Sequence, residues 1–450
     1  MKRSWLAYGL VLTALASVAA CSDDTGDDDT SSSSGSGDVD ATTSSSSSSG
    51  EATSSSSGEA TSSGSSSGEV SSSSSGEVSS SSSGDLVDAG EDATADAAPD
   101  AEQDAAVDAA DAAPPEPVGD LLHFIGRFDT TNPAVPRFQW SGSGVVASFN
   151  GTGISVKLKG DAQMQVVVDG VVKPKVVSTP VLGSYVLADG LPAGVHKVEI
   201  YRRDEAEYGS VEFHGLEVQG GALVPTPFPF AHRMEFIGDS ITAGYGIEGV
   251  EKPELNQYCD ATADNTNEYL TYSAVAARAL NAAHSSIAWS GRGMVRNYND
   301  NPAPTLPELF DLTIPDEDDL WDFARYTPEV VVVYLGNNDY SKNGPPWYQD
   351  PGQIFSDGYV AFLTHLRAKY PAAHLFAVTT NGFPNASQRV QGAVQSRNTA
   401  GDARVHFAQL SEYRPDLRGY SCAQHYSIAG HALYGGELAT KIRAVMGAGW

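Results

Sequence analysis

Four short segments of the sequence contain the residue types that ester hydrolysis requires. They are residues 238–246 with Ser240, 290–293 with two glycines, 336–339 with two asparagines, and 425–431 with a histidine at each end. A histidine can remove the proton of a serine hydroxyl, which then attacks a carbonyl carbon. A glycine N–H, an asparagine amide and the serine N–H can bind the resulting oxyanion. The predicted chemistry is acyl transfer through a serine, and it requires neither a metal ion nor another cofactor.

Apolar strand patterns precede the first three of these segments. From residue 232 onward, strands are expected at 233–237, 286–289, 330–335, 375–380 and 405–410, and helices at 268–282, 357–369, 386–398 and 427–446. This alternation predicts a parallel sheet with helices on both faces, in a domain over residues 225–450. Ligand sites in such sheets lie at the carboxyl ends of the strands. The polar segments therefore stand where chemistry is expected.

The preceding hundred residues alternate apolar and polar side chains. Strands are expected at 123–128, 144–149, 154–158, 163–168, 171–177, 195–201 and 211–218. Asp169-Gly170 predicts a tight hairpin, because both residues accept the positive φ of a type I′ turn. The pattern predicts an all-β sandwich of jelly-roll type over residues 118–224, which ends near Gly220 and Pro225.

The N-terminus indicates export. Lys2 and Arg3 precede an apolar run over residues 6–20, which is too short to span a membrane as a helix. The run ends at Cys21 and resembles the lipobox of bacterial lipoproteins. This resemblance implies a signal peptide over 1–20 and a lipid on the Cys21 sulfur, and Ser22 favours the outer membrane. We expect a lipid-anchored cell-envelope protein that can be surface-exposed; the alternative is an ordinary secretory signal with an unmodified Cys21.

Residues 21–117 have the composition of a disordered tether. They are rich in Ser, Gly, Ala and Asp, and residues 22–116 contain 22 acidic side chains and no Lys or Arg. Such a segment has too little apolar surface to offset its ordering entropy. The whole chain has a net charge of −30 and no basic stripe, which excludes nucleic acid as the expected partner. We expect a monomer.

The four segments together resemble the SGNH (GDSL) hydrolases, because all four blocks of that family occur in order. The resemblance covers residues 232–450 and implies a flavodoxin-like α/β/α fold. It also implies Ser240 as nucleophile, Gly291 and Asn338 as oxyanion donors beside the Ser240 N–H, and His425 as base. Gly293 is the alternative donor in the second block. His431, the rival base, is expected to be structural.

The layout of a jelly roll before an SGNH domain is similar to carbohydrate esterase family two. Further similarities to that family are the segments 244–246, 268–270 and 296–298. The family removes acetyl groups from plant polysaccharides, so the resemblance implies an acetylated xylan or glucomannan as substrate. Aromatic residues after the oxyanion blocks could stack on sugar rings, and Tyr298, Tyr340 and Trp347 are the candidates.

One departure from the family concerns the acid that usually stands two or three residues before the base. These positions are Ala423 and Cys422. Some relatives work with a Ser-His dyad in which a backbone carbonyl orients the imidazole, and the carbonyl of Gln424 is the candidate here. In an exported protein Cys259 and Cys422 can form a disulfide, which would join the loop after the nucleophile to the loop of His425. The alternative is two free thiols.

Three interpretations of function remain. The first is a polysaccharide O-acetyl esterase. The second is an SGNH esterase for lipids or small acyl esters, which activity on long acyl chains would identify. The third is a catalytically weak carbohydrate-binding lipoprotein, which the missing acid favours and which would bind polysaccharide without releasing acetate.

Overall fold

The structure is a computed structural model that describes residues 119–450, apart from residues 381 and 384. The predicted signal peptide, Cys21 and the tether over 21–117 lie outside the described residues. The described residues belong to one compact unit. In this part of the chain, no helix is both long enough and apolar enough to cross a membrane.

The first hundred described residues form two antiparallel sheets, as predicted. One sheet has the order β1-β3-β8-β5-β6, with β10 paired to β3, and the other has the order β2-β9-β4-β7. The strands are β1 (His123–Ile125), β2 (Arg137–Phe138), β3 (Gly144–Gly151), β4 (Gly153–Lys159), β5 (Ala162–Val168), β6 (Val171–Ser178), β7 (Gly183–Ala188), β8 (Gly194–Arg202), β9 (Val211–Gln219) and β10 (Ala222–Val224). The predicted strands are all present, and β2, β7 and β10 are additions.

Alternation of side chains explains how the two sheets pack. Val166 of β5, Phe149 of β3 and Ile154 of β4 are buried in one apolar cluster between the sheets. The predicted hairpin joins β5 to β6, with Asp169 and Gly170 at φ 51° and 75°. These positive values are those of a type I′ turn.

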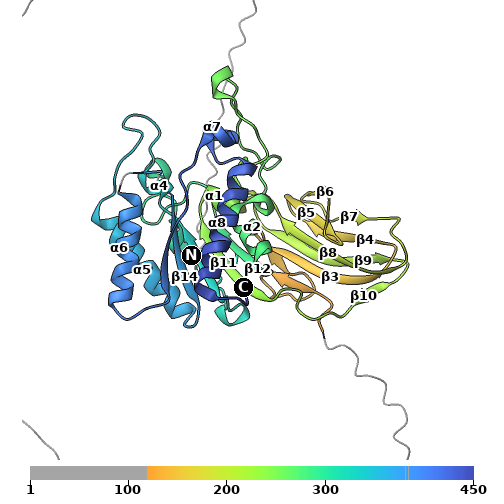
Figure 1. The fold of residues 1–450 in the computed structure, drawn as a ribbon. Coiled ribbons are helices and arrows are strands. Elements are labelled where there is room, and N and C mark those ends of the chain that lie inside the picture. The colour runs from red at the N-terminus through yellow and green to blue at the C-terminus, as the bar shows by residue number, and fades with distance from the viewer. Residues whose placement is uncertain (1–118, 381, 384) are drawn as a thin grey trace, which may run out of the picture. The chain divides into compact units, whose positions relative to one another are not determined.

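The remainder is an α/β/α domain with a five-stranded parallel sheet in the order β12-β11-β13-β14-β15. The strands are β11 (His232–Gly238), β12 (Ala282–Ala288), β13 (Val330–Tyr334), β14 (His374–Thr379) and β15 (Val405–Gln409). Helices α5 (Gln353–Lys369) and α6 (Ala386–Thr399) cover one face, and α2 (Tyr272–Ala279) and α8 (Ile428–Met446) cover the other (Figure 1). This strand order is the flavodoxin-like one, so the predicted fold is confirmed.

Short helices occupy the connections. They are α1 (Ser240–Ala243), α3 (Leu306–Leu309), α4 (Asn337–Tyr340), α7 (Pro415–Arg418) and the 3₁₀ helices η1 (Ala206–Tyr208), η2 (Pro253–Leu255), η3 (Glu268–Leu270), η4 (Tyr298–Asp300), η5 (Phe323–Arg325) and η6 (Cys422–Gln424). The helix predicted over 268–282 was too long. Asn281 has a φ of 49°, and this left-handed residue separates α2 from β12, which begins at Ala282 rather than at residue 286.

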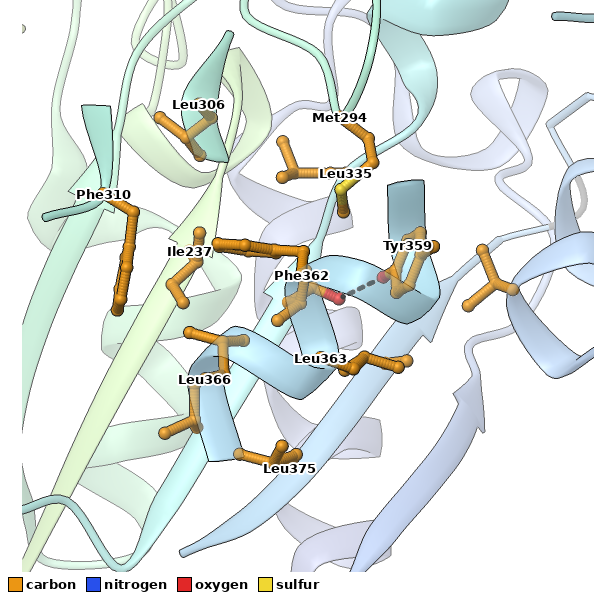
Figure 2. Packing of buried hydrophobic residues seen from close by; sticks show 14 of the residues in the cluster. Ile237, Met294, Leu306, Phe310, Leu335, Tyr359, Phe362, Leu363, Leu366 and Leu375 are labelled. Carbon is orange, nitrogen blue, oxygen red and sulfur yellow. Dashed lines mark hydrogen bonds between the residues drawn. The ribbon is translucent and has the colours of Figure 1, made fainter. Parts of the chain in front are cut away.

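The apolar core under α5 holds the ends of the central strands. Figure 2 shows Ile237 of β11 and Leu335, which follows β13, in one cluster with Met294. Tyr359 of α5 donates a hydrogen bond to the Val333 carbonyl, at 3.2 Å. Alternate residues of β13 enter the two opposite cores, so the sheet is buried on both faces. The segments that follow these strands therefore start from fixed positions.

Buried polar contacts join the sandwich to the α/β domain. The fully buried Arg127 lies 3.5 Å from the Glu235 carboxylate, and its guanidinium lies over the Phe310 ring, 4.8 Å from the centroid. Nearer the surface, Arg137 pairs with Glu317 at 2.6 Å. A buried arginine requires both a charge partner and apolar packing for its stem and face, and the α/β domain supplies them.

Candidate active site

Ser240 lies at the start of α1, directly after β11. The Asp239 carboxylate caps this helix by accepting the Ile241 N–H at 3.0 Å, and it also accepts the Asn337 side-chain amide at 3.1 Å. Gly244, at φ 78°, ends the helix in a left-handed conformation that favours glycine. Burial raises the pKa of Asp239 to about 6. The turn thus fixes the position of Ser240. The residue is 9% exposed.

The structure brings His425 to Ser240. The His425 Nε2 atom lies 2.8 Å from the Ser240 Oγ, and Nδ1 lies 3.1 Å from the Ala423 carbonyl oxygen. Since a carbonyl only accepts hydrogen bonds, Nδ1 must carry the proton, which leaves Nε2 as the acceptor that faces the serine. The predicted carbonyl of Gln424 was wrong: the left-handed Ala423 and Gln424 turn the Ala423 carbonyl, rather than that of Gln424, to the imidazole.

The surroundings of His425 favour its neutral form. Burial lowers its pKa, and this effect outweighs the opposing effects of the Ala423 and Cys422 backbone hydrogen bonds and of the Glu251 charge. The Tyr245 ring lies beside it, with 5.0 Å between the ring centroids. A neutral imidazole that accepts at Nε2 is the form that can remove a serine proton.

Gly291 and Asn338 lie after β12 and β13, the two strands that flank β11. Gly291 has a φ of 77°, and a Cβ at this position would meet no atom within 4 Å. The Asn338 Nδ2 donates to the Arg292 carbonyl at 2.8 Å, which leaves its second N–H for another acceptor. Gly293, the alternative donor, is buried and its N–H already bonds to the Asn297 Oδ1 at 3.0 Å. The geometry therefore favours Gly291.

A buried carboxylate ties these two segments together. Asp339 accepts hydrogen bonds from the N–H groups of Met294, Val295 and Arg296, at 2.8, 2.7 and 3.0 Å. Burial raises its pKa, although the three N–H groups oppose this effect. The loop of Gly291 and the helix of Asn338 are thus held as one piece.

His431 lies in α8 and is 2% exposed. Its Nδ1 accepts the Tyr272 N–H at 3.1 Å, and burial lowers its pKa to about 3. It therefore stays neutral and engaged with the backbone, which agrees with a structural role and not with that of the base.

Cys259 and Cys422 form a disulfide across 163 residues of sequence. Cys422 immediately precedes the turn of Ala423 and Gln424, so the bond fastens the segment of His425 to the loop that follows the nucleophile. Among the residues that the structure describes, no three His, Cys, Asp or Glu side chains are grouped to hold a metal ion.

The three aromatic candidates differ in exposure. Trp347 is 67% exposed and Tyr298 is 41% exposed, whereas Tyr340 is fully buried. The Tyr340 ring packs against Tyr348 and Phe383 with centroid distances of 5.7 and 5.8 Å. The prediction that Tyr340 contacts substrate was wrong, because its ring is part of the core beneath α4.

Two buried carboxyl groups near the site were not predicted from the sequence. Glu205, from the sandwich, accepts the Ser290 N–H at 2.8 Å and the Ser290 hydroxyl at 2.5 Å, and burial raises its pKa to about 8. Glu251 accepts the N–H groups of Ala423 and Gln424, at 2.8 and 3.1 Å. Neither glutamate belongs to a motif, and each meets its partner only after folding.

Known proteins resemble this chain over both regions. Residues 124–227 match the family model for the carbohydrate esterase 2 N-terminal region, and residues 236–433 match that of the GDSL-like lipase/acylhydrolase family. An acetylxylan esterase/glucomannan deacetylase from Cellvibrio japonicus is 30% identical over 284 residues, which cover 60% of this chain and 76% of that protein. The chain belongs to carbohydrate esterase family two. This is a family of carboxylic ester hydrolases.

Two further comparisons extend this family assignment. The cellulase/esterase CelE of Acetivibrio thermocellus is 34% identical over 344 residues, which are 75% of this chain and 41% of that protein. The chain thus spans less than half the length of this relative. A solved family two carbohydrate esterase from Clostridium thermocellum, in complex with cellohexaose, is 35% identical and matches 72% of this chain and 99% of its own, with a TM-score of 0.67.

Proposed function

We propose that the protein is a serine esterase that removes O-acetyl groups from plant polysaccharides such as xylan and glucomannan. The observation that carries this proposal is the 2.8 Å contact between His425 Nε2 and Ser240 Oγ at the carboxyl end of β11, whose neighbouring strands β12 and β13 lead to Gly291 and Asn338. The Cellvibrio relative is named as an acetylxylan esterase and glucomannan deacetylase, and this supports the choice of substrate.

The reaction would proceed in two steps. His425 Nε2 takes the Ser240 proton while Oγ attacks the acetyl carbonyl, and the N–H groups of Ser240 and Gly291 and the Asn338 amide bind the oxyanion. The imidazolium then gives the proton to the departing sugar oxygen, which leaves an acetyl-serine. In the second step His425 activates a water that releases acetate and regenerates Ser240.

Two exposed aromatic residues lie on the loops that follow Gly291 and Asn338. The N–H of Tyr298 donates to the Gly291 carbonyl at 2.9 Å, and Trp347 is on the loop that follows the helix of Asn338. An ion pair of 2.8 Å between Lys342 and Asp300 joins these two loops. We propose Tyr298 and Trp347 as stacking surfaces, since aromatic rings offer large apolar area at the surface.

The decisive experiment measures acetate release from acetylated xylan and acetylated glucomannan by the full chain and by Ser240→Ala. Ser184→Ala, which changes an exposed serine of β7, is the matched control. Release that is lost only in Ser240→Ala, together with 4-nitrophenyl ester activity that falls steeply beyond acetate, would support the proposal. Cleavage of long-chain esters without acetate release would indicate a lipid or small-ester esterase. Binding of polysaccharide without any hydrolysis would indicate a carbohydrate-binding protein.

We also propose that Cys21 carries a lipid that anchors the protein in the cell envelope, with residues 21–117 as the tether. The lipobox-like sequence before Cys21 supports this idea. Mass spectrometry of the exported protein should find an N-terminal peptide that begins at Cys21 and carries the added mass of acyl chains. A peptide cleaved elsewhere, with an unmodified cysteine, would contradict the proposal.

A further inference from the structure

The segment before His425 lacks the acid that orients the base in most SGNH hydrolases. In its place the neutral Ala423 carbonyl accepts the Nδ1 proton at 3.1 Å. A carbonyl cannot attract an imidazolium as a carboxylate does, so its contribution depends on a fixed position. What holds Ala423 therefore matters for the base.

The turn that contains this carbonyl has an unfavourable backbone. Ala423 and Gln424 are consecutive residues with φ of 52° and 58°, and L-residues with a Cβ rarely adopt this conformation. Both residues are exposed, so burial of their own side chains does not impose it. The turn therefore needs a constraint from elsewhere in the molecule.

Glu251 supplies such a constraint. It is 4% exposed, and its Oε1 accepts the Ala423 N–H at 2.8 Å and the Cys259 N–H at 3.2 Å, while Oε2 accepts the Gln424 N–H at 3.1 Å. Successive N–H groups of such a turn converge on one point and form a concave site for an anion. A buried carboxylate with three N–H donors meets the requirement that a buried charge be hydrogen-bonded.

We propose that Glu251 is the positioning residue of the base: its carboxylate holds the turn of Ala423 and Gln424 so that the Ala423 carbonyl stays on His425 Nδ1. Glu251 thereby replaces, through the backbone, the acid that is missing at positions 422 and 423. This inference rests on the proposed function, because it assigns His425 as the base.

The charge of Glu251 also acts on His425 directly. The groups that interact with His425 are the Tyr245 ring, the Ser240 hydroxyl, the backbone of Cys422 and Ala423, the His431 imidazole and the Glu251 carboxylate. That negative charge raises the pKa of His425, against the larger lowering by burial. Removal of the charge should therefore lower the pKa of His425 further.

The test is Glu251→Gln in the full chain, with kcat and KM for 4-nitrophenyl acetate measured as a function of pH. Glutamine keeps the shape and one acceptor oxygen, but its NH₂ group must face an N–H of the turn. We expect kcat to fall about 100-fold, as for other small misplacements of a catalytic group, with KM little changed and the acid limb moved to lower pH. The matched control is Glu268→Gln, which changes a buried glutamate bonded to His284 at 3.0 Å and should reduce stability without moving kcat or the acid limb.

A second readout does not depend on turnover. The Nδ1 proton of His425 should give a downfield NMR resonance that is absent in His425→Ala, and it should shift or exchange faster in Glu251→Gln but not in Glu268→Gln. This readout separates the inference from the proposed function, since it applies even if the wild type releases no acetate. If Glu251→Gln does not fold, Glu251→Asp keeps the charge but shortens the reach by one methylene, and a smaller loss of kcat is expected. An unchanged kcat and an unchanged resonance in a folded Glu251 variant would overturn the proposal.

Discussion

The two halves of the candidate site are held in different ways. Ser240, Gly291 and Asn338 follow the adjacent strands β11, β12 and β13, and their segments are locked by the carboxylates of Asp239 and Asp339. We call these segments the strand-end half. His425 instead follows η6, on a segment held by Glu251 and the Cys259–Cys422 disulfide, which we call the turn half.

Because the two halves are held differently, substitutions in them should have different effects. The strand-end half takes its positions from the buried sheet, so a side chain there can be changed while its neighbours stay in place. The turn half takes its position from single side chains that lie far apart in the sequence. Substitutions in the first half should remove chemical groups, and substitutions in the second should move the base.

Among variants that keep both Ser240 and His425, the largest effect is expected in the strand-end half, for Asn338→Ala. Loss of one oxyanion donor should lower kcat by about 10²–10³-fold, or roughly 2.7–4 kcal/mol of transition-state stabilisation. The acid limb of the pH profile should not move, since His425 and its partners are untouched. Steady-state kinetics from pH 4 to 8 would check both statements, and a shifted acid limb would show that the two halves are coupled.

Removal of the disulfide is a test of how the turn half is held. Cys259→Ala/Cys422→Ala should reduce the free energy of unfolding by about 2–4 kcal/mol, because the bond closes a long loop in the unfolded chain. It should also lower kcat, by less than Asn338→Ala, since Glu251 still holds the turn. Urea unfolding and kinetics on the same samples would measure both effects. A large loss of kcat with full stability would mean that the disulfide, and not Glu251, positions the base.

The pH profile involves one group from each half. Because burial lowers the pKa of His425, kcat/KM should stay high down to below pH 6.5 and fall as the pH drops through that pKa and the base gains a proton. Asp239 has a pKa of about 6, so it also gains a proton, and loses its charge, as the pH falls through this range. Asp239→Asn should leave the acid limb in place. Disappearance of the limb in this variant would assign it to the strand-end half.

The smallest effect on activity is expected for Glu205→Gln, at the contact with the sandwich. The pKa of Glu205 is raised to about 8, so its carboxyl is mostly neutral at pH 7 and glutamine should preserve the contact with Ser290. A raised pKa means that the folded state binds the proton more tightly; the associated stability is present near pH 4.5 and is lost as the pH rises to about 8. The variant should therefore lose less stability than the wild type between pH 5 and 8 in urea unfolding. Equal losses would mean that Glu205 is ionised in the folded protein.

Much of the fold could be predicted because its signals are local. Alternating side chains indicate the strands of the sandwich, Asp169-Gly170 indicates the hairpin, and β-branched runs indicate the buried parallel strands. The boundary errors arose where local signals compete, as at Asn281, whose left-handed backbone ends α2 and lets β12 begin earlier. Tyr340 failed for a related reason: position after an oxyanion block does not say whether a ring points to solvent or to the core.

The sequence by itself determined the residue types of the site and the strand ends that carry them, because a strand, the turn after it and the serine or asparagine in that turn are neighbours along the chain. Only the tertiary structure decided that the Ala423 carbonyl faces His425 and that Glu251 bonds to the turn which contains this carbonyl. It also decided that Glu205 reaches Ser290 from the sandwich. The contacts of Glu251 with Ala423 and of Glu205 with Ser290 join residues 172 and 85 positions apart. Their partners are brought together by the packing of whole elements, which no short segment encodes.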